Sequence, residues 1–218
     1  MTVSELLLRG STSCLPFRVR RVYCVGRNYA EHRKEMGGSD RDEPFFFQKP
    51  HDALFQSPIV FYPKGTYKLS YEAELVAVVG GRTPHIYGYA LGVDLTKRDI
   101  QSDAKKKGRP WDSSKAFDNS GLIGEIMPLG SVCESCTLQF VQNGEVKQAA
   151  KISDMIWSVP ELLSKLESQD FSVREGDFIF TGTPGGVGEL HIGDHCEVRL
   201  VDSDGHHVLP KLSFTVSR

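Results

Sequence analysis

The sequence predicts a mixed α+β domain that is rich in β-strands and carries its helices at the periphery. Three observations lead to this prediction. Short strand-like runs dominate the chain, only three segments carry helix signals, and strands do not alternate regularly with helices. The chain has 218 residues, and a chain of this length buries roughly 70% of its unfolded surface. A core therefore forms without the support of disulfides.

The predicted strands are short runs rich in β-branched and aromatic residues, bounded by turn-forming residues. They cover residues 21–25, 44–49, 59–62, 71–79, 87–93, 138–142, 177–181, 197–201 and 212–216. Two residue pairs, Asn143-Gly144 and Asp204-Gly205, predict type I′ hairpin turns, because both central positions of that turn need a positive φ.

The three predicted helices have recognisable start signals. Asn28 is placed to cap a helix that reaches about residue 36, before a pair of glycines. Thr96 is placed to cap a second helix, with Asp99 three residues further on, that runs to about residue 107. A third helix is predicted over residues 161–167, after a proline.

The composition excludes several classes of protein. Lysine and arginine total 26 and aspartate and glutamate total 28, which gives a net charge of -2. This balance gives no electrostatic case for a nucleic-acid or anionic-membrane partner. No apolar run approaches the ~20 residues of a membrane span. Five cysteines are an odd number, which argues against a secreted disulfide scaffold and for a reducing compartment.

The chain divides into an N-terminal arm, residues 1–20, and one domain, residues 21–218. The arm is rich in arginine and serine with Glu5 as its acid, a composition that resembles an organelle transit segment. The alternative is an N-terminal strand with its approach loop. A mitochondrial or a cytoplasmic location is therefore expected, and secretion is not.

One predicted strand carries two acidic side chains where its pattern predicts burial. Glu72 and Glu74 share a face with Val76 and Val78, and the opposite face is apolar as well. The strand is therefore expected to be covered on both sides. Carboxylates near a core repel each other and lose solvation, and a divalent cation removes both penalties. The alternative is a strand end exposed to water.

A third acid adds to the case for a metal. Asp94 stands where the apolar run 89–93 meets the predicted helix start at Thr96. Three hard oxygen ligands without a nearby cysteine or histidine favour Mg²⁺, Mn²⁺ or Ca²⁺ over zinc.

Other polar residues have both a chemical interpretation and an ordinary surface interpretation. Arg98 and Gln101 share a helix face at i, i+3 spacing, and so do His32 and Glu35. A carboxylate beside an imidazole raises its basicity, as a general base requires. The alternative for each is a solvated surface position, and the same holds for Lys115.

A glycine-rich turn follows the predicted strand at residues 177–181. Residues 181–188 read Thr-Gly-Thr-Pro-Gly-Gly-Val-Gly, which lets backbone N–H groups approach an anion such as a carboxylate. The alternative is a plain turn with positive φ angles. The turn is not a Walker loop, because no Gly-Lys-Ser/Thr follows.

Two motifs are set aside. Cys133 and Cys136 form a single CxxC with no second pair and no histidine close behind. This argues against a zinc ribbon, and no thioredoxin-like context supports redox activity. The basic run at residues 105–109 is short for a nucleic-acid site in a balanced chain.

Seven segments occur in an order that one family shares. They are residues 24–32 (Cys-Val-Gly-Arg-Asn-Tyr-Ala-Glu-His), 48–50 (Gln-Lys-Pro), 72–74 (Glu-Ala-Glu), 94–101 (Asp-Leu-Thr-Lys-Arg-Asp-Ile-Gln), 105–111, 115–117 (Lys-Ala-Phe) and 181–184 (Thr-Gly-Thr-Pro). In these segments the chain resembles the fumarylacetoacetate hydrolase family, and in particular its acylpyruvase branch. The resemblance runs from about residue 22 to the C-terminus.

The resemblance implies a β-sandwich roll with peripheral helices, a divalent metal (usually Mg²⁺) in an open cleft, and a homodimer. By matched positions, Glu72, Glu74 and Asp94 would be the metal ligands. His32 and Glu35 would form a catalytic dyad on a segment that substrate orders.

The resemblance also implies contacts with a small-molecule 2-oxo acid substrate. Lys115 would be both catalytic and substrate-binding, and Arg98 would also support the metal site. Val25 stands where the longer fumarylacetoacetate hydrolases carry an additional aspartate ligand, which favours the acylpyruvase branch. The substrate-binding residues would be Arg98, Gln101, Lys115, Gly182 and Thr183.

The implied activity is metal-dependent hydrolysis of the C–C bond of acylpyruvates, 2,4-dioxo acids such as acetylpyruvate or fumarylpyruvate. The products are pyruvate and a carboxylic acid. The same site would stabilise the enolate formed when oxaloacetate loses CO₂. Two alternatives stay open: an isomerase or decarboxylase of hydroxymuconate-type diacids, and a non-catalytic metal-binding domain. The pair His32 and Glu35 favours the hydrolase, and the full set with Gln101 and Lys115 argues against the binding domain.

Overall fold

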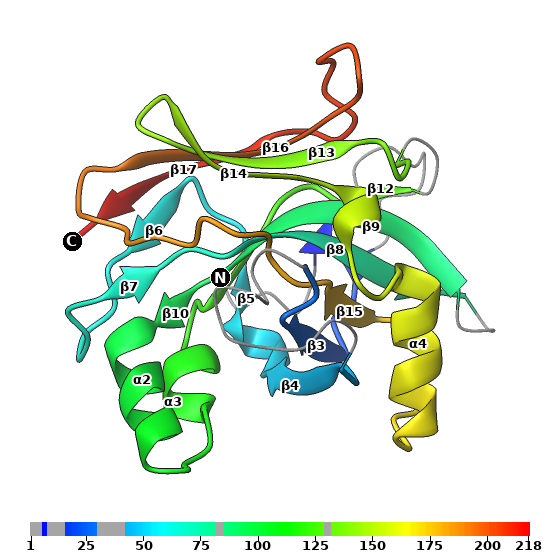
Figure 1. Ribbon diagram of the computed structural model, residues 1–218, viewed down its shortest axis with the longest axis horizontal. Coiled ribbons are helices and arrows are strands. Elements are labelled where there is room, and N and C mark those ends of the chain that lie inside the picture. Colours follow the sequence, from blue (N-terminus) through cyan, green and yellow to red (C-terminus); the bar gives the residue numbers. More distant parts are fainter. Residues whose placement is uncertain (1–5, 8–15, 30–41, 82–84, 129–131) are drawn as a thin grey trace.

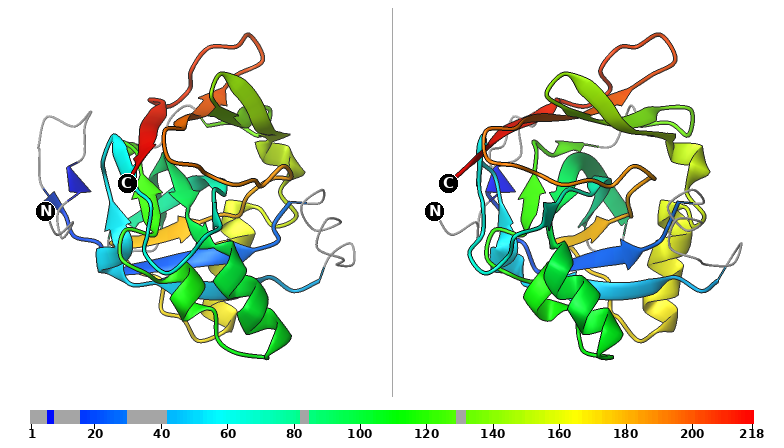
Figure 2. Two further views of the ribbon diagram at one scale, coloured as in Figure 1. Left: turned by 90° about the vertical axis from the view of Figure 1, so that its left-hand side faces the viewer. Right: turned by 60° about the vertical axis from the view of Figure 1, so that its left-hand side comes forward.

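The computed structural model describes residues 6–7, 16–29, 42–81, 85–128 and 132–218. A large, strongly curled sheet lies against a smaller sheet, and helices flank the larger one (Figure 1). Turning the molecule shows the smaller sheet stacked over the larger one (Figure 2). This arrangement confirms the predicted β-rich α+β class.

The larger sheet has eight strands in the described residues, in the order β4-β3-β15-β8-β9-β11-β5, with β12 paired to β9. It is mixed, because β15 runs parallel to β3 and β11 runs parallel to β5, while β8 and β9 form a long antiparallel hairpin. The bounds are β3 (Arg21–Gly26), β4 (Phe45–Lys49), β5 (Leu54–Phe55), β8 (Ala73–Gly80), β9 (His85–Asp94), β11 (Gly121–Ile123), β12 (Met127–Pro128) and β15 (Asp177–Phe180).

The smaller sheet has the order β14-β13-β16-β17-β6. Asn143 and Gly144 join β13 to β14 with φ angles of 53° and 83°, the positive values that the predicted type I′ turn needs. The bounds are β6 (Ile59–Phe61), β13 (Thr137–Gln142), β14 (Glu145–Lys151), β16 (His195–Val201) and β17 (Leu212–Ser217). Two short pairs complete the described strands: β1 (Leu6–Leu7) with β2 (Pro16–Phe17), and β7 (Leu69–Ser70) with β10 (Thr96–Lys97).

Strand β8 is buried on both faces, as its sequence pattern predicts. Leu75 packs in the core between the two sheets, where the rings of Tyr71 and Phe140 stack 3.9 Å apart. Val76 and Val78, on the other face, pack in a second core inside the curl of the larger sheet. Glu72 and Glu74 share this second face, so they lie along the same wall as an apolar core.

Three α-helices lie in the described residues: α2 (Arg98–Lys106), α3 (Asp112–Lys115) and α4 (Val159–Ser168). Two short 3₁₀ helices complete the described elements: η1 (His51–Ala53) lies between β4 and β5, and η2 (Ile152–Asp154) lies between β14 and α4. Ser158 and Glu161 form a capping box at the start of α4, so this helix begins before the predicted residue 161. Within the described residues, no helix is long and apolar enough to cross a membrane.

Two local predictions are wrong. Thr96 does not cap α2: it pairs with Ser70 as part of β10, and Asp99 instead accepts hydrogen bonds from the residues before β7. Thr96, which the capping pattern assigned to a helix start, is therefore part of a strand. Asp204 has no positive φ, whereas Gly205 has 84°. The amide of Gly205 donates to the carbonyl of Asp202, so the turn closes one residue earlier than a type I′ turn on Asp204-Gly205 would.

Strand β14 was not among the runs predicted from composition. Its sequence is EVKQAAK and most of its residues are exposed, which lacks the β-branched and aromatic content of the predicted strands. It is an edge strand, and its pairing with β13 forms it. The helix predicted after Asn28 lies outside the described residues.

Candidate active site

Three carboxylates meet at one end of the β8–β9 hairpin. Glu72 precedes β8, Glu74 lies within it and Asp94 ends β9, and the amide of Asp94 donates to the carbonyl of Glu72 at 2.8 Å. Each offers a carboxylate oxygen within 4.8 Å of the others. The residues are only 7%, 2% and 0% exposed. The structure therefore brings together the three predicted metal ligands in a buried cluster.

Basic side chains balance most of this negative charge. Lys115 Nζ lies 2.6 Å from Glu72 Oε2 and 2.7 Å from Asp94 Oδ2. Arg98 Nη2 lies 2.6 Å from Glu72 Oε1. Burial opposes the charge of Lys115, but Asp94 and Glu72 outweigh burial and raise the pKa of Lys115. Lys115 is therefore a fully charged ammonium held between two carboxylates.

Glu74 has a different environment from the other two acids. Its Oε2 accepts a 2.7 Å hydrogen bond from the amide of Gly182, and no described basic side chain forms an ion pair with it. Burial, followed by the charges of Asp94 and Glu72, raises the pKa of Glu74 well above its usual range. Glu74 is therefore the carboxylate that an added cation would stabilise most.

Lys49 belongs to the same cluster, although sequence reasoning gave it no role. It ends β4, its side chain is fully buried, and its Nζ lies 2.8 Å from Asp94 Oδ1. It also donates a short hydrogen bond to the carbonyl of Lys115. The available signal was the segment Gln-Lys-Pro at residues 48–50, in which a lysine ends an aromatic strand.

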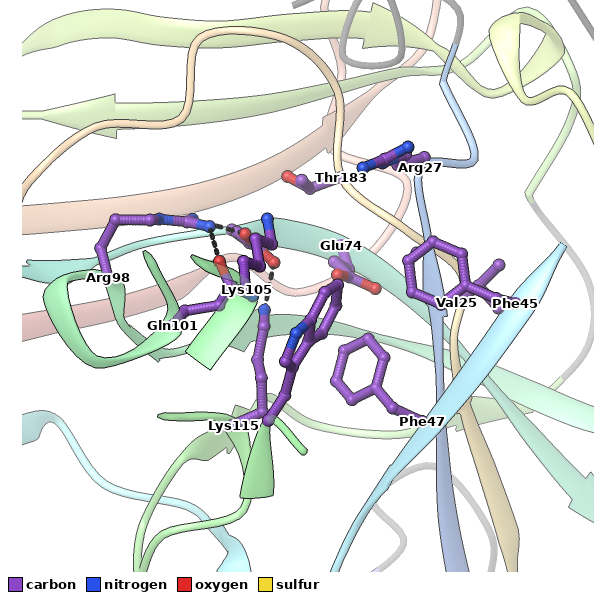
Figure 3. A pocket seen from close by; sticks show the side chains of 13 residues that line it. Val25, Arg27, Phe45, Phe47, Glu74, Arg98, Gln101, Lys105, Lys115 and Thr183 are labelled. Atoms are coloured by element: carbon purple, nitrogen blue, oxygen red, sulfur yellow. Dashed lines mark hydrogen bonds and ion pairs between the residues drawn. The ribbon is translucent and has the colours of Figure 1, made fainter. Parts of the chain in front are cut away.

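Arg98 and Gln101 lie on one face of α2, as their spacing predicts. Arg98 Nη1 donates to Gln101 Oε1 at 2.7 Å, which fixes the orientation of the amide and leaves its N–H groups on the far side. Gln101 is 3% exposed. Both side chains line the same pocket as Glu72, Glu74 and Lys115 (Figure 3).

The Thr-Gly-Thr-Pro turn supports the cluster from the other side. Gly182 has a φ of 100°, and its amide approaches a carboxylate that belongs to the protein itself, Glu74. Thr183 lines the pocket, but its hydroxyl donates to the carbonyl of Ala73 and accepts from Gln148. Substrate contacts of Gly182 and Thr183 stay predictions, and in this structure both residues brace the strand that carries Glu74.

Asn28 ties this turn to the end of β3. Its Nδ2 donates to the carbonyls of Trp157 and Thr181, and its Oδ1 accepts from the amide of Trp157, all within 2.9 Å. The predicted dyad residues His32 and Glu35 come shortly after it in the chain. Both lie outside the described residues.

The wall of the pocket is aromatic and its remaining charges are basic (Figure 3). The rings of Phe45 and Phe47 pack edge-on against Trp111, with centroids 5.5 and 6.0 Å from it. Arg27 and Lys105 also line the pocket. A pocket with buried carboxylates, an apolar wall and further basic side chains suits a small, negatively charged organic ligand.

A second group of possible metal ligands, Asp202, Asp204 and His206, lies on the turn between β16 and β17. Asp202 Oδ1 accepts hydrogen bonds from the amides of Asp204 and His206. These bonds explain the arrangement as a turn motif.

The comparison with known proteins agrees with this geometry. Residues 21–217 match the family model "Fumarylacetoacetate (FAA) hydrolase C-terminal". The chain is 36% identical over 212 residues to oxaloacetate tautomerase YcgM from Escherichia coli, covering 91% of this chain and 94% of the relative. It is also 36% identical over 212 residues to human mitochondrial oxaloacetate tautomerase FAHD1, covering 91% and 92%.

A solved structure is similar over the whole length. The crystal structure of fumarylpyruvate hydrolase from Pseudomonas aeruginosa, in complex with Mn²⁺ and pyruvate, superposes with a TM-score of 0.88. The two chains share 40% identity, and the match covers 100% of this chain and 97% of the other. Sequence, fold and the buried acidic cluster lead to one conclusion: this chain belongs to the fumarylacetoacetate hydrolase family.

Proposed function

We propose that this protein is a metal-dependent enzyme that hydrolyses the C–C bond of acylpyruvates, such as acetylpyruvate or fumarylpyruvate. The products are pyruvate and a carboxylic acid. The observation that carries the proposal is the buried triad of Glu72, Glu74 and Asp94, whose member Glu74 has no described ion-pair partner. The similarity to a fumarylpyruvate hydrolase that binds Mn²⁺ and pyruvate supports the same chemistry.

The triad fits a divalent cation, because its donors are three buried carboxylates and no sulfur or nitrogen ligand is among them. Glu72, Glu74 and Asp94 would hold Mg²⁺, and Mn²⁺ or Ca²⁺ would substitute for it. When bound, the cation would supply Lewis-acid stabilisation of negative charge on the 2-oxo acid.

Lys115 and Gln101 would bind the substrate beside the triad. The amide N–H groups of Gln101 are aimed by Arg98 and would donate to the carboxylate of the 2-oxo acid. The ammonium of Lys115 would donate to the 2-oxo oxygen and stabilise the negative charge that develops there. The hydrogen bond from Arg98 orients Gln101 before the substrate arrives, which lowers the cost of orienting its amide during the reaction.

His32 would act as the general base, with Glu35 holding its imidazole in the required tautomer. It would take a proton from water, and the resulting hydroxide would attack the carbonyl carbon distal to the 2-oxo acid. The C–C bond then breaks, its electron pair forms the enolate of pyruvate, and a proton returns to the enolate carbon. A carboxylic acid is the other product.

Oxaloacetate chemistry is a second candidate, favoured by the relatives named oxaloacetate tautomerase. Tautomerisation and decarboxylation of oxaloacetate both pass through an enolate, which Lys115 would stabilise in the same way. Neither reaction needs water activation. The isomerase or decarboxylase of hydroxymuconate-type diacids belongs to this same mechanistic class.

The test is turnover of acetylpyruvate, fumarylpyruvate and oxaloacetate with and without added Mg²⁺, after chelation of bound metal. Metal-dependent release of pyruvate from both 2,4-dioxo acids is expected. Glu74→Gln should abolish it, and Glu175→Gln, at an exposed loop position, should not. Tautomerisation or decarboxylation of oxaloacetate, with no release of pyruvate from either 2,4-dioxo acid, would favour the second candidate. Metal binding without any turnover would favour a binding domain.

The remaining proposals concern the context of the enzyme. Residues 21–218 would form the catalytic domain, with residues 1–20 as an arm. The protein would act as a homodimer in the mitochondrion or the cytoplasm; one relative is named as mitochondrial.

A further inference from the structure

Two basic side chains that line the pocket differ from the three beside the acidic triad, because among the described residues they form no ion pair with it. Lys49, Lys115 and Arg98 each pair with an acid of the triad. Arg27, directly after β3, and Lys105, on α2, also line the pocket. Within the described ranges, neither of these two forms an ion pair with a carboxylate.

The described neighbours that Arg27 and Lys105 contact in the pocket are aromatic rings, and no described carboxylate lies within ion-pair distance of either cation. Lys105 Nζ lies 4.9 Å from the ring centroid of Trp111, and the Arg27 guanidinium lies 5.9 Å from that of Phe45. Arg27 Nε is buried and has no hydrogen-bond partner in the part of the chain that the structure describes. Burial, followed by the charges of Arg98 and Arg27, lowers the pKa of Lys105 to about 8. The positive charges of Arg98 and Arg27 thus disfavour the charged form of Lys105, and a bound anion would offset this repulsion.

We propose that Arg27 and Lys105 bind a second carboxylate of the substrate, so that the enzyme prefers 2-oxo acids with a carboxylate at both ends. The inference rests on the proposed function for one point, the binding of the 2-oxo acid end at the triad. The aromatic wall of Phe45, Phe47 and Trp111 contacts both basic groups, since Lys105 lies over Trp111 and Arg27 over Phe45. Such a wall suits a planar, unsaturated linker between the two carboxylates. Fumarylpyruvate has this form, and acetylpyruvate lacks the second carboxylate.

The test compares kcat/KM for fumarylpyruvate with kcat/KM for acetylpyruvate. In Lys105→Met and Arg27→Gln, the ratio of the two should fall roughly 10- to 100-fold, as for the loss of one charge-assisted hydrogen bond. Lys106→Met is the matched control and should keep the wild-type ratio, because Lys106 follows Lys105 on α2, is exposed as Lys105 is, and does not line the pocket. An unchanged ratio in both test variants, or an equal fall in the control, would overturn the proposal.

A binding experiment separates this proposal from the proposed function. Calorimetry with Mg²⁺ would compare 2-oxoglutarate, which has two carboxylates, with 2-oxobutyrate, which has one. A preference for 2-oxoglutarate that Lys105→Met removes supports the second carboxylate site, even if neither 2,4-dioxo acid is turned over. Hydrolysis of both 2,4-dioxo acids with no preference in either experiment leaves the proposed function standing and refutes the site.

An independent observation concerns Cys133 and Cys136, in the turn before β13. Their sulfur atoms lie 2.8 Å apart, and Cys136 Sγ also accepts a hydrogen bond from the amide of Cys133. Cys133 is exposed and Cys136 is buried. Hydrogen bonds from Cys136 and Ser135 lower the pKa of the Cys133 thiol. The turn therefore presents one accessible thiol with a second thiol directly behind it.

We infer that this pair is a thiol modification site that forms an intramolecular disulfide by exchange with a small-molecule disulfide such as glutathione disulfide. The thiolate of Cys133 attacks one sulfur of the reagent and expels the first small thiolate. The thiolate of Cys136 then attacks the Cys133 sulfur and expels the second. The two protein thiols lose two protons and two electrons, and the reagent is reduced to two thiols.

The test treats the native protein with glutathione disulfide, alkylates the remaining thiols after denaturation, and maps the peptides by mass spectrometry. We expect a disulfide between Cys133 and Cys136, with the buried Cys24 and Cys196 alkylated. Cys136→Ser should stop at a mixed disulfide on Cys133, and Cys133→Ser should leave Cys136 free. Alkylation of both cysteines in the wild-type protein, or a persistent mixed disulfide there, would overturn the inference.

Discussion

Replacing Lys49 with methionine should destabilise the protein and make its stability depend more strongly on a divalent cation. Lys49 is fully buried, contacts Asp94 at 2.8 Å and donates to the carbonyl of Lys115. Removing one partner of a buried ion pair costs about 3–5 kcal/mol. We expect the lower end, about 3 kcal/mol, because Lys115 still pairs with Asp94 and Ser120 still donates to the carbonyl of Lys115.

In a domain of this size, about 3 kcal/mol corresponds to a fall in Tm of roughly 6–12 °C. Differential scanning calorimetry of the metal-free protein would measure it. Adding Mg²⁺ should raise the Tm of Lys49→Met more than that of the wild type, because the cation replaces the positive charge of Lys49 beside Asp94. Lys211→Met is the control, since Lys211 makes a half-exposed surface pair with Glu197 and should cost at most about 1 kcal/mol. A Lys49→Met protein as stable as this control would refute the assigned role of Lys49.

Three further outcomes are expected. His32→Ala should abolish acylpyruvate hydrolysis and leave the Mg²⁺ affinity measured by calorimetry unchanged; a loss of affinity would contradict its role as general base. Gly182→Ala should lower the free energy of unfolding by roughly 1–3 kcal/mol, because φ is 100° and the new Cβ would lie 2.7 Å from Asn28 Cβ; an unchanged denaturation midpoint would contradict this strain. Chelating a cation that was present at 100 times its Kd should remove about 2.7 kcal/mol of stability, and this loss should be absent in Glu74→Gln if Glu74 is a required ligand.

Features that depend on a few neighbouring residues, such as a strand pattern or a hairpin turn, could be predicted from the sequence. The period-2 pattern around Glu72 and Glu74 implied a buried strand with two acids on one face, and the structure places both beside Asp94. The Asn143-Gly144 turn is confirmed because its two residues alone fix the required φ angles.

The rest depends on contacts between distant parts of the chain. Lys49 joins the cluster because the curl of the larger sheet brings the end of β4 to Asp94, 45 positions further along the chain. Thr96 has a good capping sequence, but pairing with Ser70 holds it extended. The basic run at residues 105–109 is too short to predict a nucleic-acid site, and only the position of α2 shows that Lys105 lines the pocket. A single sequence contains no direct record of such pairings.

The double attachment of Lys115 suggests an order of events. Its ammonium donates hydrogen bonds to Glu72 and Asp94, the same carboxylates that a cation would engage. A bound cation would weaken these hydrogen bonds and leave the Lys115 ammonium available to donate to the oxyanion of the substrate. We therefore expect ordered addition, in which the cation enters first and the organic acid second, and we expect saturating organic acid to slow the escape of the cation. The same attachment gives two carboxylates of the triad an internal counter-ion, so that the fold need not wait for metal in order to form.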